Sequence, residues 1–238
     1  MTKPFDSAAD LVDAPNVGAR LRPRNAATLI LVRRDAGEPQ VLMGRRAEGH
    51  VFMASKWVFP GGRVDSGDAT APAATELRPE VLAHPALGAS KGVARGLGIA
   101  AIRETFEEAG LFVAKPAPPW PEVGRAWREF AERGVAPDLA ALEFIARAIT
   151  PPGRARRFDA RFFMADASAL IDLGPGDGDR ELDEIAWLRL DALSGLDLPQ
   201  ITRFVLSEVV KRLEDEVGDV PFVRMIRGKH VVERLRLD

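Results

Sequence analysis

The stretch that decides the fold is Arg103-Glu104-Thr105-Phe106-Glu107-Glu108-Ala109-Gly110-Leu111. Apolar residues recur with helical spacing from about Val93 to Ala109, and Gly110 suits the left-handed residue that ends a helix. Glu104 lies three residues before Glu107 and four before Glu108, so the three carboxylates share one helix face. Two of them also lie in the last turn, where the helix dipole disfavours negative charge. A hard divalent cation would neutralise this repulsion, because Mg²⁺ and Mn²⁺ prefer carboxylate oxygen.

Spacing alone allows a second interpretation, in which the helix is an acidic surface paired with Arg103 and neighbouring basic residues. An upstream feature favours the metal site. Phe59-Pro60-Gly61-Gly62 places two glycines at the end of an apolar strand. There the backbone can approach a metal or a phosphate without an intervening side chain.

These segments resemble the two halves of the Nudix signature. The stretch RETFEEAGL is similar to its REUXEEXGU half, where U is a bulky apolar residue, with Thr105 as the one mismatch. Gly62 to Asp68 resembles the GX5E opening, with aspartate in place of glutamate. Residues 69–102 separate the halves, so roughly 27 residues interrupt the box. The resemblance implies an α/β (α+β) protein, a Nudix-type α/β/α sandwich with a mixed β-sheet and an insertion inside the box.

Further features resemble the Nudix subgroup of acyl-CoA diphosphatases whose box is interrupted. They are the split box itself, Phe52-Met53 ahead of VFPGGRVD, Thr150-Pro151, and the run RRFDARFF at 156–163. One departure is Ala148, which stands where this subgroup is expected to have tryptophan.

The resemblance also implies roles for individual residues. Glu104, Glu107 and Glu108 would be the metal ligands, with the Gly61 carbonyl as an additional one. Glu107, Glu108 and Arg103 would form the catalytic set. We expect Arg103 to pair with Asp68 or with a ligand glutamate. The general base would be Glu107 or Glu108, or a carboxylate of the 176–184 loop, for which the choices are Glu181 and Glu184.

Arginines are expected to contact the substrate, since guanidinium groups match phosphate oxygens bidentately. The residues that we predict for this role are Arg45, Arg46, Arg157 and Arg161. For each of them the plainer alternative is a solvated charge on a strand or loop.

The reaction that the resemblance implies is Mg²⁺- or Mn²⁺-dependent hydrolysis of a phosphoanhydride bond, with CoA or acyl-CoA as the first choice of substrate. NADH, ADP-ribose or another nucleoside diphosphate derivative is the alternative substrate. A different class of function is a non-catalytic Nudix metabolite sensor, and another is a scaffold whose acidic helix is a partner surface. Retention of all three glutamates favours the enzyme.

Composition narrows the remaining classes. The 238 residues are 46% hydrophobic and carry a formal charge of −2, so there is no basic surplus for a nucleic-acid backbone. The absence of cysteine excludes disulfides, zinc–thiolate sites and thiol nucleophiles. No apolar run reaches the length of a membrane span. We therefore expect a cytoplasmic protein with a small-molecule diphosphate as its partner, no nucleic acid, no membrane, and a possible homodimer by superfamily habit.

The organisation predicted along the chain is an irregular lead-in at 1–24 followed by one domain at 25–238. Within that domain, 69–95 is the insertion and 198–238 is a C-terminal helix plus a hairpin that turns at Arg227-Gly228-Lys229. Predicted strands cover 26–32, 40–43, 143–149 and 158–164, with the first two forming a hairpin, and a helix is expected over 123–133. In the 158–164 strand, phenylalanines alternate with charged residues, which predicts one buried face and one polar face.

Overall fold

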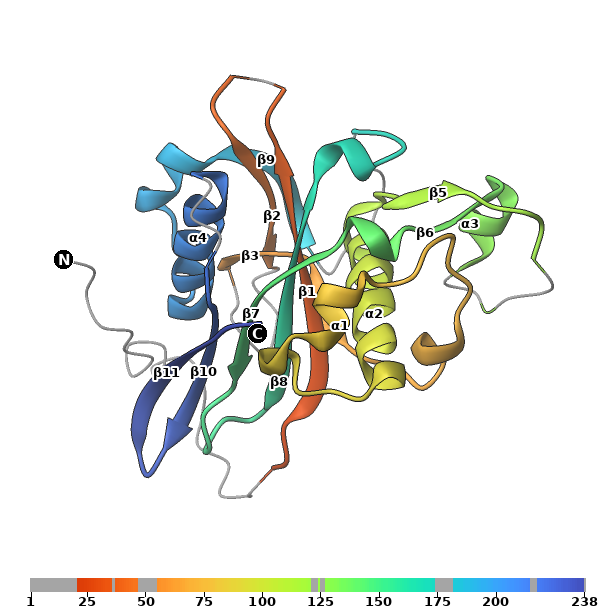
Figure 1. The fold of residues 1–238 in the computed structure, drawn as a ribbon. Helices are drawn as coiled ribbons and strands as arrows, with labels where there is room; N and C mark the ends of the chain where they lie inside the picture. Colours follow the sequence, from red (N-terminus) through yellow and green to blue (C-terminus); the bar gives the residue numbers. More distant parts are fainter. Residues whose placement is uncertain are drawn as a thin grey trace.

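The computed structural model describes residues 21–35, 37–46, 55–120, 124, 127–173, 182–214 and 218–237. Figure 1 shows a twisted β-sheet with helix α2 (Lys91–Ala109) on one side and helix α4 (Gln200–Leu213) on the other. Phe52, Met53, Glu181 and nearly all of the predicted lead-in lie outside the described residues. The sheet strands are β1 (Arg24–Arg33), β2 (Gln40–Arg46), β3 (Trp57–Val58), β4 (Gly61–Arg63), β7 (Glu143–Ile149), β8 (Phe158–Asp166), β9 (Leu182–Arg189), β10 (Val220–Ile226) and β11 (Lys229–Leu235).

Strand β1 lies near the centre of the sheet, and its apolar residues explain why both faces of the sheet are covered. Its run of apolar residues alternates between two cores, because successive side chains of a strand point to opposite faces. Leu29 and Leu31 pack in the core on the α2 face, whereas Ile30 and Val32 pack in the core on the α4 face. A strand that is buried on both faces needs a helix layer on each side, which is the arrangement observed.

The sheet is mixed, as predicted. Its order is β11-β10-β7-β8-β1-β2-β3, with β4 pairing β1 and β9 pairing β2. Strand β1 runs parallel to β8 in a register that places Ala26 opposite Ala160, and β7 runs parallel to β10. The remaining pairs are antiparallel. Both predicted hairpins are present, β1 with β2 and β10 with β11.

Residues 69–90 run past α2 and over strands β7 and β8 as a chain of short turns. They comprise the end of the 3₁₀ helix η2 (Asp68–Thr70), helix α1 (Pro79–Ala83) and the 3₁₀ helix η3 (Pro85–Leu87). Side chains of Leu77, Leu139 and Leu142 pack close to Gly98 of α2, so segments outside the sheet also cover this helix. Helix α2 ends as predicted, at Gly110 with φ of 68°.

The polar face predicted for β8 is covered by protein. The side chain of Arg161 is only 2% exposed, and its Nε donates to the Leu87 carbonyl of η3 at 3.1 Å. The alternation of phenylalanines and charged residues is correct, but segment 69–90 packs over the charged face. Burial lowers the pKa of Arg161 to about 10, although the neighbouring Asp159 charge opposes this shift.

One helix differs from the sequence prediction, and one small sheet was not predicted. Helix α3 (Arg128–Glu132) is shorter than the helix expected over 123–133, of which residues 123, 125 and 126 are outside the described part. Strands β5 (Ala114–Pro116) and β6 (Val135–Pro137) pair with each other as a separate two-stranded sheet. None of the helices in the described ranges is long and apolar enough to cross a membrane.

Candidate metal-dependent active site

Arg103 organises the acidic face of α2. Its Nε and one terminal nitrogen bind the Asp68 carboxylate at 2.9 and 3.0 Å. The other terminal nitrogen donates to Glu104 at 2.8 Å and to Glu107 at 2.9 Å. A fifth hydrogen bond reaches the Arg63 carbonyl at 3.0 Å. The predicted pairing of Arg103 with Asp68 or a box glutamate is thus confirmed on both counts, and all five N–H groups of the guanidinium are in use.

The negative charges around Arg103 offset the cost of burying its charged guanidinium. Its side chain is 7% exposed and that of Asp68 is 3% exposed. Burial by itself disfavours the charged guanidinium, but hydrogen bonding to Asp68 and the charges of Glu104, Asp68 and Glu107 raise the pKa of Arg103 above its ordinary value. Arg103 is therefore a permanent cation that fixes the loop at Asp68 to the helix that carries the glutamates.

Two glycines let β4 approach this helix face. The Gly61 N–H donates to Glu108 Oε2 at 3.0 Å, which anchors the most buried of the three glutamates to the strand. A Cβ at Gly62 would lie 2.4–2.6 Å from the Glu104 carboxylate, and a Cβ at Gly61 would lie 2.6 Å from the Ala27 carbonyl. A side chain at Gly61 would collide with the backbone of β1, whereas a side chain at Gly62 would displace the Glu104 carboxylate.

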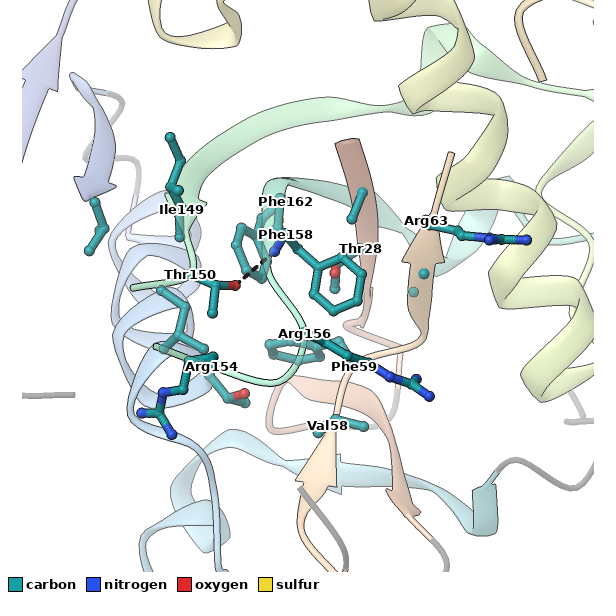
Figure 2. Close-up of a pocket in the computed structure, with 18 of the residues that line it drawn as sticks. Thr28, Val58, Phe59, Arg63, Ile149, Thr150, Arg154, Arg156, Phe158 and Phe162 are labelled. Atoms are coloured by element: carbon teal, nitrogen blue, oxygen red, sulfur yellow. Dashed lines mark hydrogen bonds between the residues drawn. The ribbon is translucent and has the colours of Figure 1, made fainter. Parts of the chain in front are cut away.

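A cavity of about 420 Å³ opens beside this contact, on the sheet face that α4 covers. Its apolar wall contains Phe59 and the β8 residues Phe158 and Phe162, which Figure 2 shows near Thr28 of β1. Glu104, Gly61 and Gly62 line it at the box. The volume falls within the range of about 300–1,000 Å³ that is usual for small-molecule sites. The cavity and the acidic helix face are therefore adjacent parts of one site.

The three box glutamates offer the carboxylate oxygens that a divalent cation prefers. In the structure, however, hydrogen bonds within the protein hold these side chains, and they do not converge on one point. No three His, Asp or Glu side chains form a ready-made metal site within the described ranges. In the structure Arg103 donates to one oxygen each of Glu104 and Glu107, while Glu108 accepts from the Gly61 N–H. Hard oxygen donors beside a side-chain-free backbone suit Mg²⁺ or Mn²⁺, provided that these side chains turn.

The arginines predicted to bind phosphate are dispersed. Arg46 lines the cavity, and it also has a contact within the protein. Arg45 does not line it and pairs with Glu184 at 3.3 Å, with both side chains about half exposed. Arg157 donates to the carbonyls of Thr150 and Leu21.

Arg161 lies on the opposite sheet face, beneath η3, where it also binds Asn25. The structure therefore brings only Arg46 of the four to the cavity.

Three cavity arginines were missed by the sequence interpretation, namely Arg63 of β4 and two residues that follow β7. Arg154 and Arg156 belong to the loop between β7 and β8 and both line the cavity, the first buried and the second exposed. The sequence does contain closely spaced arginines directly after Pro151-Pro152-Gly153, and this could have drawn attention to the loop. Sequence alone does not reveal which arginines of such a loop turn inward.

Glu184 of β9 contacts Arg45 in the structure, and it is not among the described residues that line the cavity. The three box glutamates thus remain as the described carboxylates that share the site's helix face.

Part of this chain is similar to a known protein. No protein-family model matches the chain. The acyl-coenzyme A diphosphatase NUDT19 of Gallus gallus is 30% identical over a 180-residue alignment, which covers 52% of this chain and 47% of that protein. The chain thus spans about half the length of this curated relative.

Solved structures agree with the fold. A NUDIX hydrolase from Alicyclobacillus acidocaldarius is 28% identical with a TM-score of 0.58, over 79% of this chain and 91% of the other. The NUDIX domain of Shewanella oneidensis NrtR, solved in complex with ADP ribose, is 14% identical with a TM-score of 0.50, over 90% of this chain and 99% of the other, and shows the fold alone. The chain carries both halves of the box, joined by Arg103 and Asp68, and it is similar in sequence and fold to Nudix hydrolases.

Proposed function

We propose that the protein hydrolyses a phosphoanhydride bond in a nucleoside diphosphate-linked substrate and depends on Mg²⁺ or Mn²⁺. The observation that carries the proposal is the position of Glu104. This residue belongs both to the three-glutamate face of α2 and to the wall of the cavity, where its carboxylate packs against Gly62. A ligand in the cavity would therefore lie beside the metal-binding carboxylates.

The residues that would hold the cation are Glu104, Glu107 and Glu108, with the Gly61 carbonyl as a further donor. When bound, the cation supplies charge stabilisation at the phosphoanhydride and a more acidic water. The protein's own contribution is to position these groups. Arg103 orients Glu104 and Glu107, and Gly61 orients Glu108 through its N–H. Glu107 or Glu108 would accept the proton of the attacking water.

We propose CoA or acyl-CoA as the substrate. The similarity to an acyl-coenzyme A diphosphatase over half of that protein's length supports this choice. So does the aromatic wall of the cavity, which suits an apolar or aromatic group attached to a diphosphate. We further propose that 69–95 is an insertion within the box, whose packing over Arg161 extends the core on the α2 face.

The test is a panel of CoA, acyl-CoAs, NADH, ADP-ribose and dinucleoside polyphosphates with Mg²⁺ or Mn²⁺, read by product mass. We expect a CoA species to be split into a phosphopantetheine product and an adenosine bisphosphate. Glu107→Gln and Glu108→Gln should lower kcat by about 100-fold or more, as expected for loss of a ligand or base. Preference for NADH or ADP-ribose would refute the CoA assignment while leaving the reaction intact. Unchanged turnover in both variants would refute the site.

A further inference from the structure

We infer that Arg156 binds the diphosphate of the substrate. The inference rests on the proposed function and adds to it a residue that determines how the substrate is placed. A diphosphate beside three glutamates needs cationic partners, and guanidinium groups supply them in a geometry that matches phosphate oxygens. Such a partner must have N–H groups that are free to donate to the phosphate oxygens.

Arg103, the cation nearest to the glutamates, has no donor left for a substrate. Its five N–H groups are taken by Asp68, Glu104, Glu107 and the Arg63 carbonyl. Breaking these bonds would expose a buried charge pair, which is costly. Arg103 therefore organises the glutamates and does not contact the substrate.

Of the cavity arginines other than Arg156, three have contacts within the protein. Arg63 pairs with Asp65 at 3.1 Å. Arg46 and Arg154 each interact with another group of the chain. Arg156 differs from them, because it lines the cavity, is exposed, and forms no hydrogen bond or ion pair with any residue that the structure describes. It is the cavity cation that a ligand can engage without displacing a protein group.

The loop that carries Arg156 is fixed at its two ends. Thr150 donates its N–H to the Phe158 carbonyl at 2.9 Å, and the Phe158 N–H donates to the Thr150 hydroxyl at 3.0 Å. Arg157 adds a bond to the Thr150 carbonyl. Because the loop is closed by these bonds, the position of the Arg156 backbone relative to the sheet is set before the substrate binds.

Figure 2 shows the direction of the side chain. Arg156 leaves the loop and extends toward the side of the cavity formed by β4, whereas Arg154 points to the other side of the view, where α4 lies. Gly61 and Gly62 of β4 line the cavity next to Glu104. Arg156 thus extends toward the part of the cavity where the cleaved bond must lie if the glutamates hold the metal.

The first test uses CoA and dephospho-CoA, which carry the same diphosphate and differ in one 3′-phosphate. Arg156→Gln should lower kcat/KM by about 10- to 100-fold for both, the range expected for a lost charge-assisted contact. Arg156→Lys should recover part of the loss because it retains the charge without the bidentate geometry. Arg128→Gln is the matched control, since Arg128 is exposed on α3 and does not line the cavity; it should leave both values unchanged.

A second measurement does not need turnover. Calorimetric titration with a methylene-bridged nucleoside diphosphate in metal-free buffer should show affinity reduced about tenfold or more in Arg156→Gln, and unchanged in Arg128→Gln. A kinetic loss confined to CoA would assign Arg156 to the 3′-phosphate and overturn the inference, as would no loss on either substrate. If the wild-type protein cleaved nothing yet bound the analogue through Arg156, the proposed function would fail and this inference would stand.

Discussion

The Glu104 carboxylate lies so close to the Gly62 backbone that the Cβ of any other residue would overlap with it. The crowding involves the end of a flexible side chain, so a methyl group there would displace the carboxylate and leave the fold intact. At Gly61 the neighbours are backbone atoms of β1, which cannot move in the same way. The two adjacent glycines therefore have different consequences, one for the position of a proposed metal ligand and one for the sheet.

We predict that Gly62→Ala lowers metal-dependent activity by about 10- to 100-fold, the effect typical of disturbing the groups that orient a metal ligand. Its melting temperature should stay close to that of the wild type. Gly67→Ala is the control, since a Cβ at Gly67 meets nothing within 4 Å. Activity and the Mg²⁺ concentration for half-maximal rate, measured beside thermal unfolding, check the prediction. Wild-type activity in Gly62→Ala would show that the Glu104 position is irrelevant.

At the scale of elements, Asp68 and Arg103 join the 3₁₀ helix η2 to helix α2. Asp68 accepts two hydrogen bonds from Arg103 and a third, at 2.8 Å, from the Asp65 N–H. Both partners are nearly inaccessible to solvent. Loss of one member of such a pair leaves the other charge uncompensated, which is more costly than loss of an exposed pair.

We therefore predict that Asp68→Asn lowers the free energy of unfolding by about 2–4 kcal/mol. The loss stays below the upper limit for a buried pair because Glu104 and Glu107 still face Arg103. Asp68→Glu restores the residue of the usual signature and should lose less, although its extra methylene must fit a buried site. Urea denaturation at neutral pH measures both variants. Equal stability of Asp68→Asn and the wild type would show that the contact does not hold the two elements together.

The elements that were predicted correctly are those whose determinants are local. Helix α2 could be predicted because its apolar spacing and Gly110 lie within one stretch, and the Arg103–Asp68 pair because the signature joins its two halves. The burial of Arg161 could not be predicted, because it depends on the packing of η3 over β8. Leu87 of η3 lies 74 positions before Arg161 in the chain. Strands β5 and β6 carry weak signals because each is three residues long and ends in proline. The inward direction of Arg156 depends on loop closure between Thr150 and Phe158, which no spacing encodes.

At the scale of the whole molecule, the cavity is bounded by parts that are far apart in the sequence. Its wall includes Ile201 and Thr202 of α4 and His230 of β11 as well as the box residues. These distant parts are held together by Glu208 of α4, whose side chain is 2% exposed. Arg234 of β11 donates to both of its carboxylate oxygens, at 2.6 and 3.1 Å, and Lys211 donates at 2.8 Å. Glu208 therefore links α4 to the C-terminal hairpin.

Glu208 also makes the stability of this link depend on pH. Burial disfavours its charged form, but the hydrogen bonds from Arg234 and Lys211 outweigh burial and lower the pKa of Glu208 below its ordinary value of 4.5. A carboxylate whose pKa is lower in the folded state stabilises the fold above its unfolded pKa, and this stability is lost as the pH falls through the folded pKa. The contribution is therefore fully present at pH 7 and declines below about pH 4.5.

We predict that Glu208→Gln lowers the free energy of unfolding by about 1–3 kcal/mol at pH 7, less than for a fully buried pair because Arg234 and Lys211 are each 39% exposed. The gap between variant and wild type should narrow as the pH is lowered from 5 to about 3, because the wild-type carboxylate becomes protonated and loses its advantage over the amide. Glu214→Gln, at the exposed end of α4, is the control and should show no such gap. Urea unfolding of the three proteins at each pH is the measurement. A gap of constant size from pH 7 to pH 3 would mean that the charge of Glu208 does not hold α4 to the hairpin, and that packing alone closes this side of the cavity.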